Sequence, residues 1–592
     1  MIVRTFHALR AALGLALAAF MTTATWGQVP STGVPEFGVS LTAAPALYQP
    51  QLDPAQQEST TEQPILVAQQ PEVAPFTAPA TVKTPIAPNA PGYQLSEADV
   101  ERIVAEYMAK RDAESQSARI TTSAVPFVNE RRVEADTASF ETMFQPPAAA
   151  KAPEPYEVGS DTALSAKWNN GLELQSKNKD FKVHVGGRTQ FDTSFFQNDG
   201  HLEAAPGPAG IGPLQDSMQF RRARLRVDGT IYEQISFACE YEFLNVGTVA
   251  AGPPVVAATV PCPTDLWVNF AELPIIGNIK IGNQKDPMGF EHLMSSRYLD
   301  FIERSFNQDL LYGPFNNGFS PGIVAWNTVL EDRASYAFGA FAANLNDGTN
   351  IFGYGLGNDY MYASRLTWLP IYDADGRYLV HLGCSYEYRN SDDGRVRIRT
   401  RGNIRNGPPG PFNSVYADST LLLAEGQGLT NFEFASVVGP WTIQAEWNFS
   451  NIYNAFQTAG VPAPVNRGDV LVQGGYVELL YYLTGEHRSY SFERAAFDRV
   501  VPNANAFRLR SRNGRIIQGP GAWQVGLRYD YADVDDSGIN GGTLNGYTLG
   551  LNWFFNPNMK FQWNWDWTHR SQVGAVAPGD VLGFGTRLAI DF

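Results

Sequence analysis

The C-terminal part of the chain alternates apolar and polar side chains with a period of two residues. From about residue 166 onward, segments of roughly ten residues show this alternation, separated by clusters of Gly, Asn and Asp. The apolar faces carry aromatic side chains, as in Trp441, Ile443, Ala445, Trp447 and Phe449, and in Phe561, Trp563, Trp565 and Trp567. A soluble sandwich also alternates, but large aromatics opposite a face of Arg, Glu, Asp and Gln favour lipid outside and water inside.

The last segment strengthens this interpretation. One face consists of Phe584, Thr586, Leu588, Ile590 and Phe592, and the sequence ends on Phe592 itself. Such a strand resembles the signal by which outer-membrane barrels are recognised for assembly. We therefore expect an all-β protein, a transmembrane antiparallel β-barrel over residues 166–592. About 425 residues suit about 16 strands, which leave an aqueous channel inside.

The first residues predict export. In residues 1–27, Arg4 and Arg10 precede or border an apolar run at 11–21 that is too short to span a bilayer, as in a signal peptide. No later stretch is long and apolar enough to predict a transmembrane helix. An exported chain of this kind is periplasmic, secreted or an outer-membrane barrel, and the alternation described above favours the barrel.

Two linkers and a short helix are predicted between the signal and the barrel. Residues 28–92 are rich in Pro, Ala and Gln and predict a disordered, extended linker, and residues 119–165 predict a second linker. Between them, residues 93–118 show helical spacing after a capping residue, Ser96. Two interpretations of this amphipathic helix stay open, an oligomerising or docking helix and a marginal helix in a disordered arm.

Charge and composition exclude several other classes of protein. The net charge of −16 argues against a nucleic-acid partner. Three cysteines do not make a disulfide framework, although a bridge between Cys239 and Cys262 stays open. No spacing of Cys and His predicts a metal site, and no cofactor is expected. No Ser, His and acidic set is spaced for catalysis, so we expect no enzyme.

The strongest candidate for pore chemistry is the segment FRRARLRVDG. Read alternately from Phe220, it places Arg222, Arg224, Arg226 and Asp228 on one face, whereas Arg221 belongs to the other face and reaches the membrane interface at the strand's end. Arginines facing lipid at mid-membrane would cost roughly 2–4 kcal/mol each, which predicts that their face lines the lumen. They could form a ladder of weak anion sites, or pair with Glu240 and Glu242 on the next strand. Arg188 is a further lumen-facing candidate.

Three other segments carry charge. The run at 395–401 and Arg508, Arg510 and Arg512 lie among Gly, Asn and Pro, which predicts external loops or strand tips. The connection at 286–321 is expected to be the third external loop, folding inward to narrow the pore. Lys285, Arg297 and Arg304 would then lie near the constriction, beside Glu291, Asp300 and Glu303.

Several motifs resemble the phosphate-selective porins of the porin O/P type. These motifs are GGRTQFD at 186–192, FRRARLRVDGTI at 220–231, IGNQKDPMGFE with SSRYLDFIERS within 281–305, GGYVELLYYLTGEHRSY at 474–490, GAWQVGLRYDY at 521–531, TLGLNWFFNPNMKFQWNW at 548–565 and GTRLAIDF at 585–592. The resemblance implies a 16-stranded, trimeric outer-membrane barrel that passes phosphate or polyphosphate along an arginine ladder toward a lysine-containing constriction. Arg222, Arg224 and Arg226 match the RRARL motif of this ladder, whereas lysine is scarce in this barrel.

We therefore expect a porin for passive diffusion of small hydrophilic solutes, with anions such as phosphate favoured. The acidic balance suggests an alternative, a general or weakly cation-tolerant porin. A second alternative is a structural barrel tethered to the cell wall through its N-terminal arm. The expected location is the outer membrane with the arm in the periplasm. Expected partners are membrane lipid, small anions, two further copies in a homotrimer, and a cell-wall or periplasmic contact of the arm.

Overall fold

A computed structural model describes residues 156–244, 261–313, 318–342, 360–390, 394–405, 413–510 and 513–592. Four predicted segments lie wholly or partly outside these residues. They are the signal peptide, the first linker, the helix at 93–118 and the second linker as far as residue 155. Within the described ranges, no helix has the length and apolar character needed to cross a membrane.

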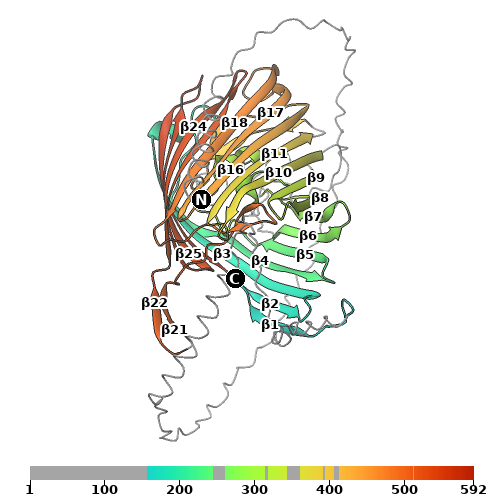
Figure 1. The fold of residues 1–592 in the computed structure, drawn as a ribbon. Helices are drawn as coiled ribbons and strands as arrows, with labels where there is room; N and C mark the ends of the chain where they lie inside the picture. Colours follow the sequence, from blue (N-terminus) through green and yellow to red (C-terminus); the bar gives the residue numbers. More distant parts are fainter. Residues whose placement is uncertain are drawn as a thin grey trace, which may run out of the picture. The chain divides into compact units, whose positions relative to one another are not determined.

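Sixteen antiparallel strands of the described chain close into a barrel, which confirms the predicted fold (Figure 1). In order they are β3 (Phe181–Asn198), β4 (Ser217–Ile231), β5 (Ile235–Glu242), β6 (Cys262–Leu273), β7 (Gly277–Gln284), β8 (Ser320–Val329), β9 (Ala334–Ala342), β10 (Tyr360–Asp373), β11 (Tyr378–Asn390), β16 (Gly426–Val438), β17 (Trp441–Gln457), β18 (Val465–Tyr482), β23 (Ala522–Asp536), β24 (Ile539–Asn556), β25 (Met559–Ser571) and β26 (Gly579–Asp591). Each pairs with the next, and β26 pairs with β3 to close the ring.

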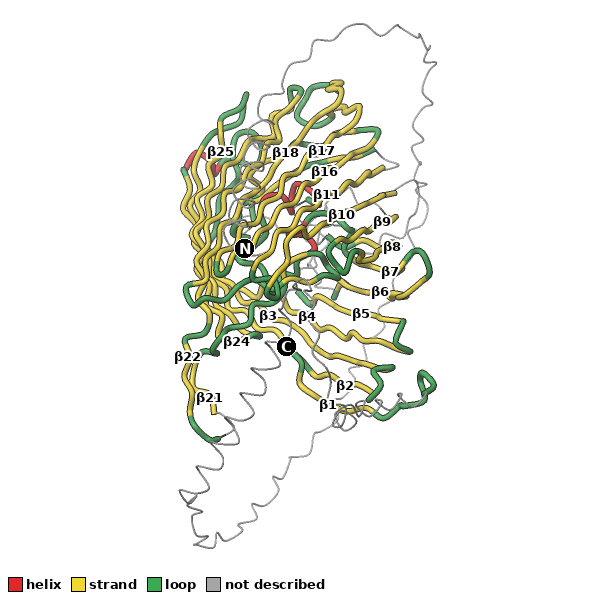
Figure 2. Tube along the Cα trace, viewed as in Figure 1, coloured by secondary structure: helices red, strands yellow, loops and turns green. Residues whose placement is uncertain are grey.

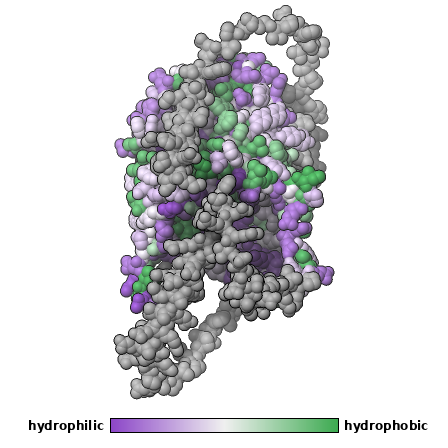
Figure 3. Space-filling model, in the orientation of Figure 1, coloured by the Kyte–Doolittle hydropathy of each residue, from purple (hydrophilic) through white to green (hydrophobic). Residues whose placement is uncertain are grey.

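The two faces of each strand have the predicted polarity. In β25, Gln562, Asn564 and Asp566 are buried toward the lumen, whereas Trp565 and Trp567 are 44% and 45% exposed on the outer face. This distribution is inverted relative to a soluble sandwich, because lipid covers the outer wall. Figure 3 shows apolar side chains on the visible outer wall and strongly hydrophilic ones along the rim at the top of the view.

The two ends of the barrel differ in the length of their connections. At one end the turns after β4, β6, β8, β10, β16 and β24 are short. The first barrel strand, β3, begins at this end, and the last, β26, ends there. Long loops lie at the other end, at 199–216, 243–261, 285–319, 343–359 and 391–425. Short turns face the periplasm in outer-membrane barrels, so the long loops face outward. The connection at 285–319 is the third of these, as the sequence predicted.

One long connection breaks this pattern. Residues 483–521 join β18 to β23 at the short-turn end and contain two hairpins, β19 (Tyr490–Ser491) with β20 (Ala496–Phe497) and β21 (Phe507–Arg510) with β22 (Ile516–Gly519). The described arginines of the run at 508–512, Arg508 and Arg510, are therefore on the periplasmic side. Their assignment to an external loop was wrong. The end of the barrel at which a long connection lies depends on the number of strands before it, and the sequence alone does not give this number. Arg512 lies outside the described residues.

A hairpin precedes the first spanning strand and extends the seam of the barrel. β1 (Leu164–Trp168) pairs with β2 (Leu172–Ser176), and β2 pairs with β3 from Leu172 opposite Val185 to Gln175 opposite Lys182. β26 pairs with β3 only as far as Asp591 opposite Arg188. β2 thus takes over the free edge of β3 where β26 has ended, which leaves less of that edge unpaired.

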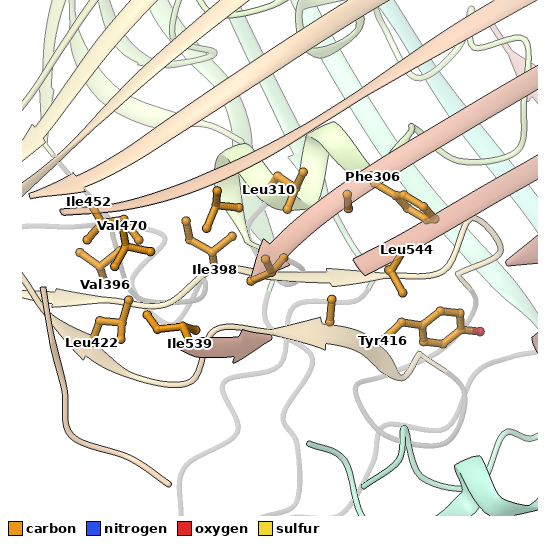
Figure 4. Packing of buried hydrophobic residues seen from close by; sticks show 14 of the residues in the cluster. Phe306, Leu310, Val396, Ile398, Tyr416, Leu422, Ile452, Val470, Ile539 and Leu544 are labelled. Carbon is orange, nitrogen blue, oxygen red and sulfur yellow. The ribbon is translucent and has the colours of Figure 1, made fainter. Parts of the chain in front are cut away.

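Much of the lumen is filled by loops that fold inward (Figure 2). The third external loop contains α3 (Phe290–Leu293) and α4 (Phe306–Tyr312), and the loop at 391–425 contains β12 (Arg395–Val396), β13 (Arg399–Arg401), β14 (Val415–Asp418) and β15 (Leu422–Leu423). Phe306 and Leu310 of α4 belong to one apolar cluster with Ile398 and Tyr416, as Figure 4 shows. The run at 395–401 is therefore in an external connection, as predicted, but part of that connection packs inside the barrel.

Glycines on the lumen face provide the space for this packing. An added Cβ would lie 2.9 Å from the Phe301 ring at Gly550 and 3.1 Å from it at Gly526. At Gly546 it would lie 2.9 Å from the ring of Phe306. These strand glycines therefore form shallow recesses in the wall for aromatic side chains of the third loop, and the loop is held at a fixed depth.

Both cysteines considered for a bridge are free. Cys239 pairs with Leu266 across β5 and β6, whereas Cys262 pairs with Glu242. The two are not opposite each other in the register, so the pairing of β5 with β6 does not bring their side chains together.

Candidate pore constriction

A β-bulge on β4 changes the faces expected for the arginine segment. Gln190 of β3 pairs with Arg222, but the next residue, Phe191, pairs with Phe220, so Arg221 has no partner in the ladder. Phe220 is consequently 54% exposed on the outer wall, 5.1 Å from the ring of Phe191. Strict alternation would place Phe220 on the same face as Arg222, but one extra residue moves everything before it to the opposite face.

The same bulge turns two consecutive arginines inward. Arg221 Nε lies 3.0 Å from Glu303 Oε1, and Arg222 Nη1 lies 3.4 Å from the same oxygen. Arg222 also donates to Gln190 at 2.8 Å. Arg221 therefore does not reach the membrane interface, contrary to the expectation from strict alternation, and both side chains hold the third loop against β4.

Three of the predicted cations meet at one carboxylate of β5. Glu240, which is fully buried, lies 2.7 Å from Arg188 Nη2, 3.0 Å from Arg224 Nη1 and 3.7 Å from Arg297 Nη2. The three arginines come from β3, β4 and the third loop. Arg224 also pairs with Glu242 at 2.7 Å. The sequence left two interpretations open, a ladder of anion sites and pairing with carboxylates of the next strand. The cluster has features of both, because Glu240 and Glu242 pair with the arginines and yet three arginines surround Glu240.

Arg226 lies at the next lumen-facing position of β4. Its Nε is 2.8 Å from Asp228 and its Nη1 is 2.7 Å from Asp265 of β6. The side chain remains 18% exposed, compared with 10% for Arg224 and 14% for Arg297. These three guanidinium groups are thus more accessible from the lumen than those of Arg188 and Arg222, which are almost fully enclosed.

Lys285 and Arg304 have a different role. Lys285 Nζ donates to the backbone carbonyls of His292 and Met294, and Arg304 donates to those of Glu291 and Met294. Burial lowers the pKa of Lys285, and the nearby Arg304 lowers it further. Both residues fasten the third loop to itself, and neither joins the cluster around Glu240.

The acidic residues expected beside the constriction do lie in the lumen. Glu303 contacts Arg587 of β26 at 2.7 Å in addition to the two bulge arginines. Burial raises the pKa of Glu303, but these guanidinium groups, Arg221 foremost, bring it well below its ordinary value. Asp300 lies 3.3 Å from Arg488. Glu291 accepts hydrogen bonds from Ser305, so it belongs to the loop's internal structure.

A second inward loop locks onto the first. Asp309 of α4 lies 2.8 Å from Arg401 and 3.0 Å from Arg405. Asn403 donates to Asp530 at 2.9 Å and to Asp566 at 3.1 Å, which ties the loop to β23 and β25. The sequence prediction missed this arrangement. A usable signal was the alternation of Val396 and Ile398 with the arginines, since both apolar side chains are buried.

The connection at 483–521 enters the lumen from the periplasmic end. Arg365 of β10 donates to the backbone carbonyls of Arg494 and Ala495 and pairs with Glu433 at 2.6 Å. Phe497 packs 5.0 Å from the ring of Phe290, so the first hairpin of this connection touches the third loop. Within the described residues, at least these three connections narrow the barrel, of which the sequence predicted one.

A cavity extends from the Glu240 cluster toward the periplasmic end. Its lining includes the cationic side chains Arg188, Arg297, Arg499 and Lys560, and one carboxylate, Asp591. The lining thus carries four cationic side chains and one carboxylate, which forms an ion pair with Arg499, although the chain as a whole is acidic.

Comparison with known proteins identifies relatives of the chain. A family model described as phosphate-selective porin O and P matches residues 201–592. Porin O of Pseudomonas aeruginosa is 27% identical over 436 residues, which span 68% of this chain and 86% of porin O. An uncharacterised protein of Caulobacter vibrioides is 24% identical over 489 residues, 78% of this chain and 87% of that protein.

Solved structures of porins also align with the chain. OmpF of Salmonella typhi, in complex with daunomycin, is 12% identical, covers 72% of this chain and 100% of its own, and has a TM-score of 0.40. The outer membrane channel DcaP of Acinetobacter baumannii is 10% identical, covers 70% and 99%, and has a TM-score of 0.39.

Proposed function

This chain belongs to the family of phosphate-selective porins O and P and is an outer-membrane β-barrel porin, not an enzyme, and from that premise we propose that its lumen favours small anions such as phosphate. Solutes pass by diffusion through the water-filled part of the barrel. The preference for anions depends on the charge of the side chains that border this path.

The cluster of Arg188, Arg224 and Arg297 around Glu240 is the observation that supports anion preference. Three guanidinium groups meet at the buried carboxylate of Glu240, with Glu242 as a second partner of Arg224, and the adjoining cavity is lined by Lys560 and by the ion pair of Arg499 with Asp591. In a narrow passage with low-dielectric walls, such an excess raises the local concentration of anions. Arg224, Arg226 and Arg297 offer successive, partly accessible donors, so an anion can be bound weakly at each and released to the next.

The alternative, a general or weakly cation-tolerant porin, has its own support in the structure. Each arginine of the ladder faces at least one carboxylate within 3.5 Å. Arg222 faces Glu303, Arg224 faces Glu240 and Glu242, and Arg226 faces Asp228 and Asp265. Pairing of this kind reduces the net field that a passing ion experiences. Selectivity then depends on the one surplus cation of the cluster, since Arg188, Arg224 and Arg297 share the carboxylates of Glu240 and Glu242.

The arrangement of the assembly and of the N-terminal arm is also part of the proposal. β3 begins at the short-turn end, so residues before the barrel would emerge into the periplasm. Family resemblance supports a homotrimer. An arm of more than a hundred residues on that side could contact the cell wall or a periplasmic partner, and deletion of residues 28–160 tests this tether: envelope integrity would fall while single-channel conductance stays the same.

Reversal potential in a planar bilayer tests the anion preference. Under a salt gradient the porin should be anion-selective, and added phosphate should block part of the chloride current. Arg224→Ala with Arg226→Ala should abolish that block and shift the reversal potential toward zero. Arg508→Gln, which changes an exposed arginine outside the lumen, is the matched control and should leave both unchanged. Weak or cation selectivity without block would favour the general porin.

A further inference from the structure

The second hairpin of the connection at 483–521 lies outside the barrel. It consists of β21 and β22, and Figures 1 and 2 show it projecting beyond the periplasmic rim below β24 and β25. It has no role in narrowing the lumen, unlike the hairpin β19–β20 that precedes it. A two-stranded ribbon of four residues per strand is marginal in water by itself, so its position depends on what it contacts.

The base of the hairpin is fixed to the lipid-facing wall. The Phe507 ring packs 5.1 Å from Phe555 and 5.8 Å from Trp553 on the outer face of β24. The indoles of Trp523 and Trp553 both donate to the carbonyl oxygen of Pro520, at 3.2 and 2.8 Å. Trp523 also stacks with Trp563 of β25 at 6.4 Å. Aromatic side chains gathered at one level of the wall are typical of the membrane–water interface.

The hairpin itself is basic and partly apolar. The described residues of the hairpin, 507–510 and 513–519, contain three arginines and no acidic residue in a chain whose net charge is −16. Pairing of Arg508 with Gln518 and of Arg510 with Ile516 places both arginines on one face. Phe507 and Ile517 belong to the opposite face and are 54% and 57% exposed. The ribbon therefore combines exposed apolar area with concentrated positive charge.

We propose that the hairpin β21–β22 docks on the inner leaflet of the outer membrane and binds the phosphate groups of anionic phospholipids. Its apolar face continues the aromatic belt of Trp523, Trp553 and Trp563 into the interfacial layer, and Arg508 and Arg510 reach the headgroups. Basic side chains close to an anionic lipid surface are attracted to it, which strengthens the contact. A lipid surface fits better than a protein partner, because the hairpin is continuous with a wall that lipid already covers.

This interaction is separate from solute transport. Arg508 and Arg510 are outside the barrel, on the far side of the wall from the Glu240 cluster, so they do not compete for anions in the lumen. The hairpin would instead fix the height of the barrel relative to the inner leaflet and give the porin a preference for anionic lipid.

Hydrogen exchange of the purified full-length porin in nanodiscs tests the proposal. The probes are discs of phosphatidylcholine alone and discs of an equal mixture of phosphatidylcholine and phosphatidylglycerol. Amides of residues 507–519 should exchange at least about threefold more slowly in the anionic discs, and 0.5 M salt should remove most of the difference, as expected when headgroup charge is screened. Arg508→Gln with Arg510→Gln should abolish it.

A matched variant separates this contact from a general effect of charge. Arg395→Gln with Arg397→Gln removes two arginines from the loop at the opposite, external end and should leave the lipid dependence intact. Equal exchange in both lipids, or lipid-dependent protection that survives Arg508→Gln with Arg510→Gln, would overturn the proposal. The folded, fast-migrating form of every variant in detergent gels reports whether the barrel is folded.

Discussion

Arg587 on the last strand and Asp192 on the first spanning strand form a two-pronged ion pair across the seam of the barrel. Nε and Nη2 of Arg587 lie 2.7 Å from the two carboxylate oxygens, and the arginine is completely buried. The same guanidinium group reaches Glu303 of the third loop at 2.7 Å. One side chain thus joins the closure of the barrel to the position of its constricting loop.

Replacement of Arg587 should therefore weaken the closed barrel. Arg587→Met leaves Asp192 without its seam partner and removes one of the cations at Glu303, and loss of one partner of a buried pair costs about 3–5 kcal/mol. The measurement is the temperature at which the folded, fast-migrating form disappears in detergent gels, which should fall. Arg397→Gln is the control, because its pair with Asp418 is 38% exposed on the arginine side and should matter little. Equal melting of both variants would contradict a structural role for the seam pair.

Filling a recess in the wall should destabilise the barrel through the third loop. Gly550→Val places a branched side chain where even a Cβ would lie 2.9 Å from the Phe301 ring, and overpacking of this kind costs about 1–3 kcal/mol. Urea titration in detergent should show a lower midpoint for this variant. Adding Phe301→Ala should recover part of the loss, since the clash is removed. Gly200→Val, at a glycine with open space around it, should change the midpoint little.

Acid should release the third loop through Glu303. Because neighbouring arginines hold the pKa of Glu303 below its ordinary value of 4.5, its stabilisation is complete above that value and is lost as the pH falls toward the folded-state pKa. The contribution of Glu303 to the urea midpoint should be constant from pH 8 to 5, and it should decrease below pH 4.5. Glu303→Gln should be less stable at pH 7, and its difference from the parent should shrink on acidification.

Glu331→Gln is the matched control for this experiment. Glu331 is exposed in the short turn between β8 and β9, so its removal should leave the acid limb of the curve unchanged. A stability difference between Glu303→Gln and the parent that stays constant down to pH 3 would show that ionisation of Glu303 is not responsible.

The sequence was sufficient to predict the barrel because the two solvents impose a period of two. Trp565 and Asp566 can be assigned to opposite faces without any knowledge of the neighbouring strands. The bulge at Arg221 could not be predicted in this way, since both it and Arg222 are arginines and the pattern does not reveal an extra residue. The inward path of Arg401 and Asn403 depends on partners such as Asp309 and Asp566, which are distant in sequence.

The bulge on β4 affects how firmly the third loop is held inside the barrel. In a regular strand, side chains on one face repeat at about 6.8 Å, twice the rise per residue, so a single carboxylate normally meets only one of them. The extra residue lets Arg221 and Arg222 grip Glu303 together. Together with Arg587 they give this carboxylate three cationic partners, so an irregularity of one residue adds an attachment that helps to fix a loop of more than thirty residues.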